Sequence, residues 1–385
     1  MLVYLILVAY ILIGQLLLNS KILSRTVYCS TVCMLLILIT GLRDANVGMW
    51  DTVSVYLPSF RVISSNSIAK VVTMGDTQYK FIGFVIYSKL ISFISTNDNF
   101  YIFMMAWPFY VCVTYLIKKW SSKPGYSFMV LLGLGFFTYS FSMIRGMLAL
   151  AFAALAIDAA IEDKWRRFLF LVVLGTSFHF TALAMVLLYP IKKIRWSTAK
   201  IMTILILLMV FRKGIPFLWK GFVTTFIRGV LPTYNYYGSK GGELADAMLI
   251  LYIMIGFVAL VKLWLSKKGR LRLTIKAPVY KINIGRTNKA TVLDSDFRNM
   301  LLGMTVVGSI VIYMTVVLAE MLRIAMFFSL GSALLMGNAD NGDAIVKNKK
   351  VIQFAELGQV AMLLIYFLAA ALPNMNVLPY RFFFQ

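Results

Sequence analysis

Apolar runs of about 17–23 residues follow one another along most of this chain, with short basic segments between them. A helix of this length crosses the hydrocarbon core of a bilayer, because each helical residue adds about 1.5 Å. Strands of a membrane barrel would instead alternate apolar and polar residues. With 61% hydrophobic and only 14% charged residues, the chain is also far more apolar than a soluble domain. The pattern predicts an all-α polytopic membrane protein, with residues 1–385 forming one integral membrane domain.

The basic segments predict which ends of the spans face the cytoplasm. The net charge is +23, from 38 Lys and Arg against 15 Asp and Glu. Lys and Arg in short loops mark the cytoplasmic side and meet anionic lipid head groups. No nucleic-acid motif interleaves them with aromatic residues, so membrane lipids and not nucleic acid are the expected partners. The segments expected on the cytoplasmic side are 20–25, 118–123, 162–167, 266–298 and 341–350.

Counting the crossings between these segments predicts two larger loops on the outer side. One crossing must separate Arg43, which follows the second span, from the basic segment that starts at Lys118. The short run 81–95 carries Lys89 at its centre, so we expect it to lie in the interface as an amphipathic helix. Residues 43–99 then form the first outer loop, and 212–246 form the second.

The run 168–190 has basic residues on both flanks, so both of its ends are expected on the same side of the membrane. We therefore predict two half-helices that turn near Gly175–His179 and line a pocket open to the outside. Together these patterns predict a bundle of about 10–12 transmembrane helices with re-entrant or interfacial half-helices.

Ionisable residues gather at the outer ends of the predicted spans, against the positive-inside bias. They are Arg43, Asp51, Arg145, His179, Glu320 and Arg323. Arg145 is expected at the junction of two spans, with Gly146 as the turn residue. An arginine here can also be a snorkelling anchor, Glu320 and Arg323 can form an intrahelical ion pair, and the histidine can be a core residue bonded to a carbonyl. The functional alternative is that arginine's planar fork binds a pyrophosphate, while histidine or aspartate removes a proton from a hydroxyl.

The aromatic residues near these groups have two interpretations. Trp50, Tyr56 and Tyr236 are either interface-belt residues or platforms for sugar rings. No set of carboxylates suffices for a metal cage, the three cysteines lie in apolar runs, and neither a Walker loop nor a dinucleotide fingerprint is present. We therefore expect no metal and no cofactor, and a substrate already activated by a phosphate ester and presented from the membrane.

Several segments resemble one known family. "GLRDANVGMWDTVSVYLPSF" (41–60) resembles the R-(x)n-V-G-x-D-T-x-x-Y-x-x-x-F signature of EpsG-like, Wzy-type polysaccharide polymerases, with one residue more than usual before Asp51. "SFSMIRGMLAL" and "GTSFHFTALAM" are similar to the family's Arg-span-FH-(S/T)-A-L block. "AEMLRIAMFFSL" and "VLPYRFFFQ" are similar to its closing motifs. The likeness runs roughly from Arg43 to Arg381.

This resemblance implies a glycosyltransferase of the GT-C kind in the bacterial inner membrane, with its active site facing the periplasm. The growing glycan would move from undecaprenyl pyrophosphate to the non-reducing end of an incoming lipid-linked repeat unit. A single displacement would invert the anomeric configuration, whereas a covalent intermediate would need a second, closely paired carboxylate. Matching motif positions assign roles to Arg43, Asp51, Arg145, His179 and Arg323. The three arginines would bind the pyrophosphate, and His179 or Asp51 would be the base. Glu320 is a further candidate for a catalytic carboxylate.

Other functions stay open on the sequence alone. An O-antigen ligase would share the fold class and the donor. A flippase or polysaccharide exporter would show interrupted helices in corresponding places of two repeats, whereas one broken segment is found. A membrane acyltransferase would need acyl-CoA at the cytoplasmic face. A chain-length regulator and a flippase are candidate protein partners of a polymerase.

Overall fold

Helices make up every element in the described part of the chain, which confirms the all-α prediction. The computed structural model describes residues 1–74, 79–210, Leu251, Met254, 288–316, 321–338 and 346–384. The backbone forms two compact units: Met1–Val186 with Leu364–Gln385, and Leu187–Leu363.

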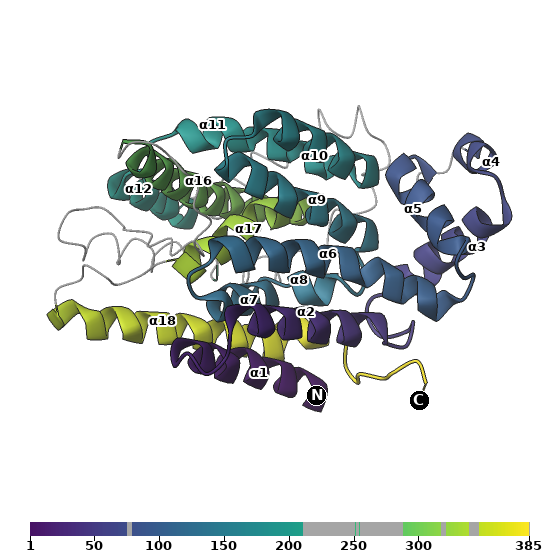
Figure 1. Cartoon of the computed structure of the whole chain (residues 1–385), viewed down its shortest axis with the longest axis horizontal. Helices are drawn as coiled ribbons and strands as arrows, with labels where there is room; N and C mark the ends of the chain where they lie inside the picture. The colour runs from purple at the N-terminus through teal and green to yellow at the C-terminus, as the bar shows by residue number, and fades with distance from the viewer. Residues whose placement is uncertain are drawn as a thin grey trace. The chain divides into compact units, whose positions relative to one another are not determined.

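The first unit contains helices of very different length (Figure 1). In chain order they are α1 (Leu2–Asn19), α2 (Arg25–Gly41), the π-helical turn η1 (Thr52–Tyr56), α3 (Leu57–Ser65), α4 (Ile68–Thr73), α5 (Ile82–Ser92), α6 (Asp98–Trp120), α7 (Pro124–Gly133), α8 (Phe136–Tyr139), α9 (Ile144–Ile161), α10 (Trp165–Phe178) and the 3-10 helix η3 (Phe180–Leu187). The C-terminal part of the unit adds the π-helical turn η7 (Phe367–Ala371) and α19 (Leu372–Asn374).

The four helices α2, α6, α9 and α10 give the first unit two distinct ends. α9 and α10 are antiparallel neighbours, and α6 packs against both α2 and α9 (Figure 1). Arg25, at the start of α2, donates a hydrogen bond of 2.7 Å to the carbonyl of Lys118, and Lys119 pairs with Glu162 at 2.6 Å. The segments 20–25, 118–123 and 162–167 therefore share one end, which we call the basic end. The opposite end, where α2 and α10 finish and α9 begins, is called the site end.

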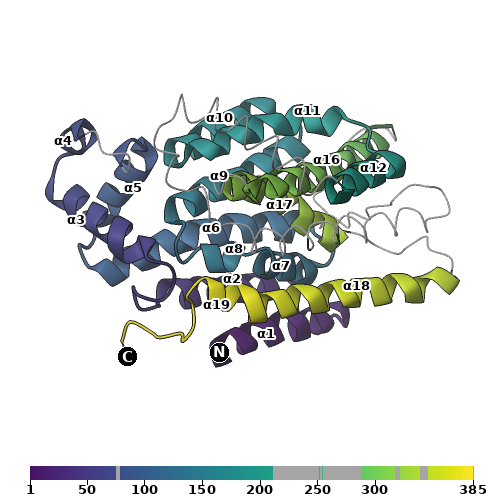
Figure 2. The same ribbon diagram turned by 180° about the vertical axis from the view of Figure 1, so that it is seen from behind.

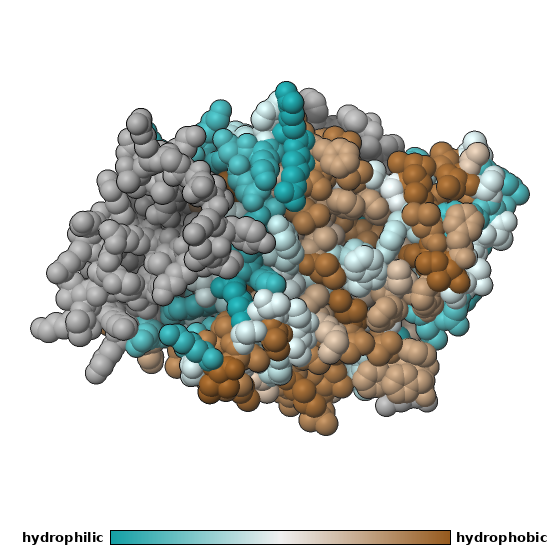
Figure 3. Space-filling view, in the orientation of Figure 1, coloured by the Kyte–Doolittle hydropathy of each residue, from teal (hydrophilic) through white to brown (hydrophobic). Residues whose placement is uncertain are grey.

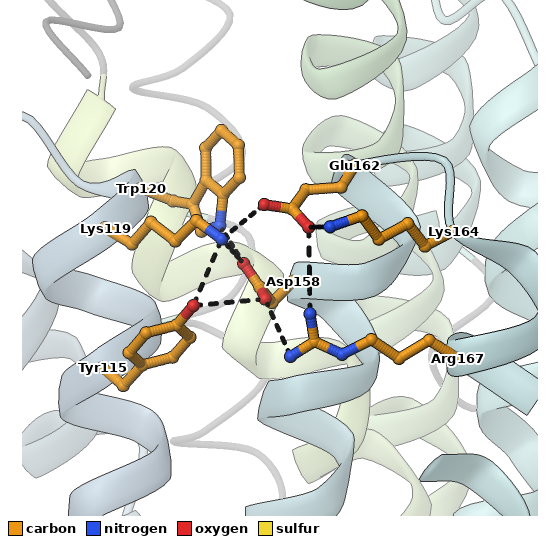
Figure 4. A network of polar contacts seen from close by, with 7 residues as sticks. All are labelled: Tyr115, Lys119, Trp120, Asp158, Glu162, Lys164 and Arg167. Carbon is orange, nitrogen blue, oxygen red and sulfur yellow. Dashed lines mark hydrogen bonds and ion pairs between the residues drawn. The ribbon is translucent and has the colours of Figure 1, made fainter. Parts of the chain in front are cut away.

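A network of charged side chains joins α6, α9 and α10 at the basic end (Figure 4). Asp158 of α9 is fully buried, and its carboxylate accepts a hydrogen bond of 2.7 Å from Trp120 Nε1. Lys119 pairs with the same carboxylate at 2.7 Å, and Arg167 approaches it at 3.4 Å. An unpaired charge at such a place would cost several kcal/mol, so these partners explain why the bundle tolerates the buried carboxylate.

Lys89, the charge at the centre of a short apolar run, stabilises the end of another helix. Its ammonium donates to the carbonyls of Ile63 (3.1 Å), Ser64 (2.8 Å) and Asn66 (2.9 Å), where α3 finishes. The last carbonyls of a helix have no intrahelical partner and carry partial negative charge, so a cation is favourable there. α5 itself has 11 residues and is too short to cross a bilayer. Its place in the membrane interface stays a prediction.

Several of the described helices have the length and the surface of membrane spans. Five stretches are long and apolar enough to cross a membrane: α1, α6, α9, α17 (Met321–Asn338) and Gln353–Asn374. Large apolar side chains are exposed on helices of the first unit, for example Leu2 (70%) and Val173 (67%). Figure 3 shows such side chains, in brown, along the lower edge of the view, where α1 lies in Figure 1. An apolar surface of this kind is expected where lipid tails cover a protein.

The second unit contains α11 (Leu188–Lys193), α12 (Thr198–Val210), α16 (Asn288–Tyr313), the 3-10 helix η6 (Met314–Val316), α17 and most of α18 (Val346–Tyr366). α16 and α17 lie side by side (Figure 2). A Cβ atom at Gly331 would come within 2.4 Å of Met304 Cβ, so glycine permits this close packing. α16 begins at Asn288, so residues 288–298 of the predicted basic loop are helical, and the side of the membrane on which 266–298 lies stays a prediction. Charged residues mark a membrane side, but they do not interrupt a helix.

The turn before α9 also differs from the prediction. Gly146 is not a turn residue but lies inside α9, as does Arg145. The chain turns earlier, at Gly135 between α7 and α8, where the backbone has a φ of +80°. Residues with an L side chain rarely adopt this conformation, so the turn requires glycine at position 135. Gly146 lies within α9, where the backbone makes no such requirement.

Candidate functional site

Arg43 is buried directly after α2, with 1% of the residue exposed. Its guanidinium donates hydrogen bonds to the carbonyls of Thr40 (2.7 Å), Val47 (3.1 Å) and Phe141 (2.7 Å) and to the hydroxyl of Thr52 (3.1 Å). It also lies over the ring of Phe141, 5.0 Å from the centroid. Burial lowers the pKa of Arg43 to about 10, so the side chain remains charged at neutral pH. These contacts tie together the end of α2, the following loop and the segment before α9.

The C-terminal segment of the chain packs against the same loop. The amides of Asp44 and Gly48 donate to the carbonyls of Arg381 and Asn376, both at 2.9 Å. Arg43 and Phe382 form an isolated antiparallel bridge. The motif around Arg43 and the closing motif therefore lie together, although they come from opposite ends of the sequence.

Asp51 and the two nearby aromatic residues have different environments. Asp51 directly precedes η1, and Tyr56 is the last residue of this turn. Tyr56 is buried, and its ring packs edge-on against Phe84 with centroids 5.9 Å apart. Trp50 is 79% exposed. A π-helical turn such as η1 is uncommon and is frequently found at functional sites.

Arg145 is the second residue of α9, and aromatic rings surround its half-buried side chain. The guanidinium carbon lies 5.0 Å from the ring centroid of Phe81, 5.7 Å from that of Tyr56 and 5.8 Å from that of Phe84. The negative face of an aromatic ring attracts a cation without neutralising its charge. This packing holds a guanidinium at the site end.

His179 occupies the break that the sequence predicts near Gly175–His179. α10 ends at Phe178, and His179 has an extended backbone (φ −156°, ψ 126°) before η3 begins, which confirms the break. His179 is 5% exposed, and its imidazole stacks on Phe81 with centroids 5.5 Å apart and planes within 5°. Its Nδ1 atom lies 2.7 Å from Thr181 Oγ1. Phe81 contacts both Arg145 and His179, so one aromatic ring links the two predicted site residues.

The remaining predicted residues belong to the second unit or lie outside the described residues. Arg323 is the third residue of α17 in the second unit and is half-buried there. Glu320, Tyr236 and the predicted loop 212–246 lie outside the described residues. The described site therefore consists of side chains from the first unit.

Sequence reasoning missed Phe81, Phe84 and Thr181. Phe81 directly precedes α5 and Phe84 lies in its first turn, within a run read only as an interfacial helix. A Cβ atom at Gly83 would come within 2.3 Å of Ser177 Oγ, which shows how closely α5 approaches the end of α10. The signal for Thr181 was present in "FHFTAL", since it stands two residues after the histidine.

A small hollow opens beside Arg43. It is lined by Arg43, Ile102, Met105, Ala106, Phe109, Ser140, Ile144 and Met147, with a cavity volume of about 10 Å³. A single water molecule already requires about 10–15 Å³ of such space. The hollow is thus too small for an oligosaccharide, and a substrate of that kind needs a larger surface.

The fold and these residues define a multi-pass α-helical membrane protein with ionisable groups gathered at one end of a helix bundle. The model of the EpsG family matches residues 26–382, nearly the whole chain, so the protein belongs to the EpsG family. This is a family of Wzy-like polymerases. At the level of the family, the protein is a polysaccharide polymerase of glycosyltransferase type with lipid-linked substrates. Comparisons with curated proteins and with solved structures found no match.

Proposed function

We propose that the protein elongates a polysaccharide of the O-antigen type. The growing glycan moves from undecaprenyl pyrophosphate to the non-reducing end of an incoming lipid-linked repeat unit. The observation that supports this proposal best is that Arg145 and His179 both pack against the ring of Phe81. The basic end carries many Lys and Arg residues, which favour the cytoplasmic side of a membrane. The site end would then face the periplasm of a bacterial inner membrane.

The arginines have separate tasks in this proposal. Arg145 and Arg323 bind the pyrophosphate, because a planar guanidinium can donate two parallel hydrogen bonds to phosphate oxygens. They stabilise the charge that develops as the diphosphate leaves, which makes the reaction independent of a metal ion. Arg43 was predicted to help them directly. Its four hydrogen bonds to the chain itself favour a different role, in which it holds the loop that carries Asp51.

The proposed chemistry is a single displacement at the anomeric carbon. The acceptor hydroxyl attacks this carbon, the bond to the diphosphate oxygen breaks, and the diphosphate leaves with the electron pair. His179 or Asp51 takes the hydroxyl proton, and the anomeric configuration inverts. A covalent glycosyl-enzyme would require a second, closely paired carboxylate, for which Glu320 is the candidate.

A deletion strain tests this function. Loss of the long glycan ladder with one capped repeat unit retained supports the polymerase. Loss of all capping identifies a ligase, and failure of repeat units to reach the outer face identifies a flippase. Purified protein should in addition convert lipid-linked repeat units alone into longer lipid-linked products. Absence of such products from active, folded protein contradicts the proposal.

A further inference from the structure

The hydrogen bonds of His179 indicate which ring nitrogen carries the proton. Nδ1 lies 2.7 Å from the hydroxyl oxygen of Thr181, and the backbone amide of Thr181 points at the same nitrogen over 3.4 Å. An amide N–H can only donate. Nδ1 must therefore offer a lone pair, and the Thr181 hydroxyl, which can donate or accept, donates to it as well.

The position of His179 in the backbone supports the same assignment. His179 directly precedes η3, and Thr181 is the second residue of that helix. The first amides of a helix have no intrahelical acceptor, and the residue before the helix commonly supplies one from its side chain. Nδ1 of His179 fills this capping role, which an N–H at that atom would prevent. A neutral imidazole has one N–H, so its proton is then on Nε2.

We propose that Thr181 is a positioning residue that fixes His179 in the Nε2–H form, so that His179 donates a hydrogen bond to a phosphate oxygen of the polyprenyl diphosphate. This inference rests on the proposed function. A nitrogen that already carries the proton cannot accept one from the attacking hydroxyl, so His179 is not the base. The stacking of the imidazole on Phe81 fixes the plane of the ring and with it the direction of the Nε2–H bond.

This assignment gives the site a consistent chemical character. Arg145 packs on Phe81 as well, so the two polar groups that share this ring are both hydrogen-bond donors suited to an anion. The proton of the acceptor hydroxyl then goes to the carboxylate of Asp51, the other candidate base. The bond from the acceptor oxygen to the anomeric carbon forms as the bond to the diphosphate breaks, and the diphosphate keeps the electron pair.

Nitrogen NMR on the full-length protein tests the tautomer directly. His179 is the only histidine of the chain, so labelling with ¹⁵N-histidine gives one pair of ring nitrogens. Spectra are recorded in lipid nanodiscs across a pH titration, and the signals of the neutral imidazole are assigned from the spectra at high pH. We expect a protonated, pyrrole-type Nε2 and an unprotonated Nδ1. A protonated Nδ1 in the neutral form overturns the inference.

Two substitutions of Thr181 separate a tautomer effect from a packing effect. Thr181→Val keeps the branched shape but removes the hydroxyl, and we expect the share of the Nδ1–H form to rise. Thr181→Ser restores the hydroxyl and should restore the wild-type spectrum. If Thr181→Val leaves the tautomer unchanged, Thr181 is not the residue that sets it.

Substitution of His179 separates a donor from a base. In His179→Gln, the side-chain amide nitrogen can lie close to the position of Nε2 and donate a hydrogen bond, but an amide cannot act as a base. Removing a donor of this kind typically costs about 10²–10³-fold in turnover, so we expect that loss for His179→Ala and a rate at least about tenfold higher for His179→Gln. Equal loss in both variants, with normal melting in detergent, contradicts the donor role. If polymerisation itself fails in wild-type protein, the NMR result still stands and only the function is wrong.

Discussion

Replacing Arg43 with alanine is expected to destabilise the protein, because its guanidinium connects three separate segments at the site end. It donates four hydrogen bonds to buried partners. A hydrogen bond to a charged group is worth about 1.5–3 kcal/mol, which sums to about 6–12 kcal/mol before the cost of burying the charge is subtracted. Buried acceptors left without a donor cost about 1–3 kcal/mol each, so we expect a net loss of about 3 kcal/mol or more. Lysine keeps the charge but lacks the planar fork, so Arg43→Lys should lose about 1.5–3 kcal/mol.

SDS titration in mixed micelles measures this loss as a shift in the unfolding midpoint. Arg61→Ala is the matched control, since the Arg61 side chain is 66% exposed and pairs with Asp98 at the surface. No measurable change is expected for it, because exposed ion pairs contribute little. If Arg43→Ala unfolds at the wild-type SDS concentration yet polymerises no glycan, Arg43 acts on the substrate directly and its proposed positioning role is wrong.

Three further predictions concern the charged residues of the first unit. Arg145→Lys should lower polymer formation by about 10²-fold with unchanged stability, because lysine cannot form two parallel hydrogen bonds to a phosphate; full activity of the purified variant would contradict the bidentate contact. Asp158→Asn should lower the free energy of unfolding by about 1.5–3 kcal/mol in the same SDS titration, since Lys119 and Arg167 lose their fully buried partner and keep only Glu162; an unchanged midpoint would show that Asp158 contributes nothing. Burial alone would raise the pKa of Glu162, but Lys119 and Lys164 together hold it below the ordinary value of a glutamate. The stability from this lowered pKa is fully present above the pKa of the unfolded state and is lost as the pH falls through the folded-state value, so Glu162→Gln should flatten the acid limb of a pH–stability curve.

Much of the helical framework follows from hydropathy and charge. A run of apolar residues fixes the length of a span, and the positions of Lys and Arg relate the ends of different spans. This reasoning predicts that 20–25, 118–123 and 162–167 share one side, and the contacts of Arg25 and Lys119 bring these segments to one end of the first unit. The break at His179 is predictable for the same reason, because basic flanks on both sides of 168–190 demand a turn between them.

The partners of the site residues are harder to predict, because they come from segments far apart in the chain. Hydropathy ranks Phe81 with every other apolar residue, although it contacts both Arg145 and His179. The same limitation affects Arg43. Its place in a motif predicts importance, but only the acceptors at Thr40, Val47, Thr52 and Phe141 distinguish a residue that organises the loop from one that meets a substrate.

α9 connects the buried network at the basic end with the candidate site. Arg145 and Asp158 stand 13 residues apart on this helix, which corresponds to about 20 Å along its axis. Asp158 is held by Trp120, Lys119 and Arg167 on two neighbouring helices, so a slip of α9 by one residue, about 1.5 Å, would break contacts of 2.7 Å. The network therefore fixes how far Arg145 reaches into the aromatic cluster. Since a misplacement of about 1 Å can cost about 10²-fold in rate, Asp158→Asn should reduce polymerisation in the molecules that remain folded, although Asp158 lies about 20 Å along the helix axis from Arg145.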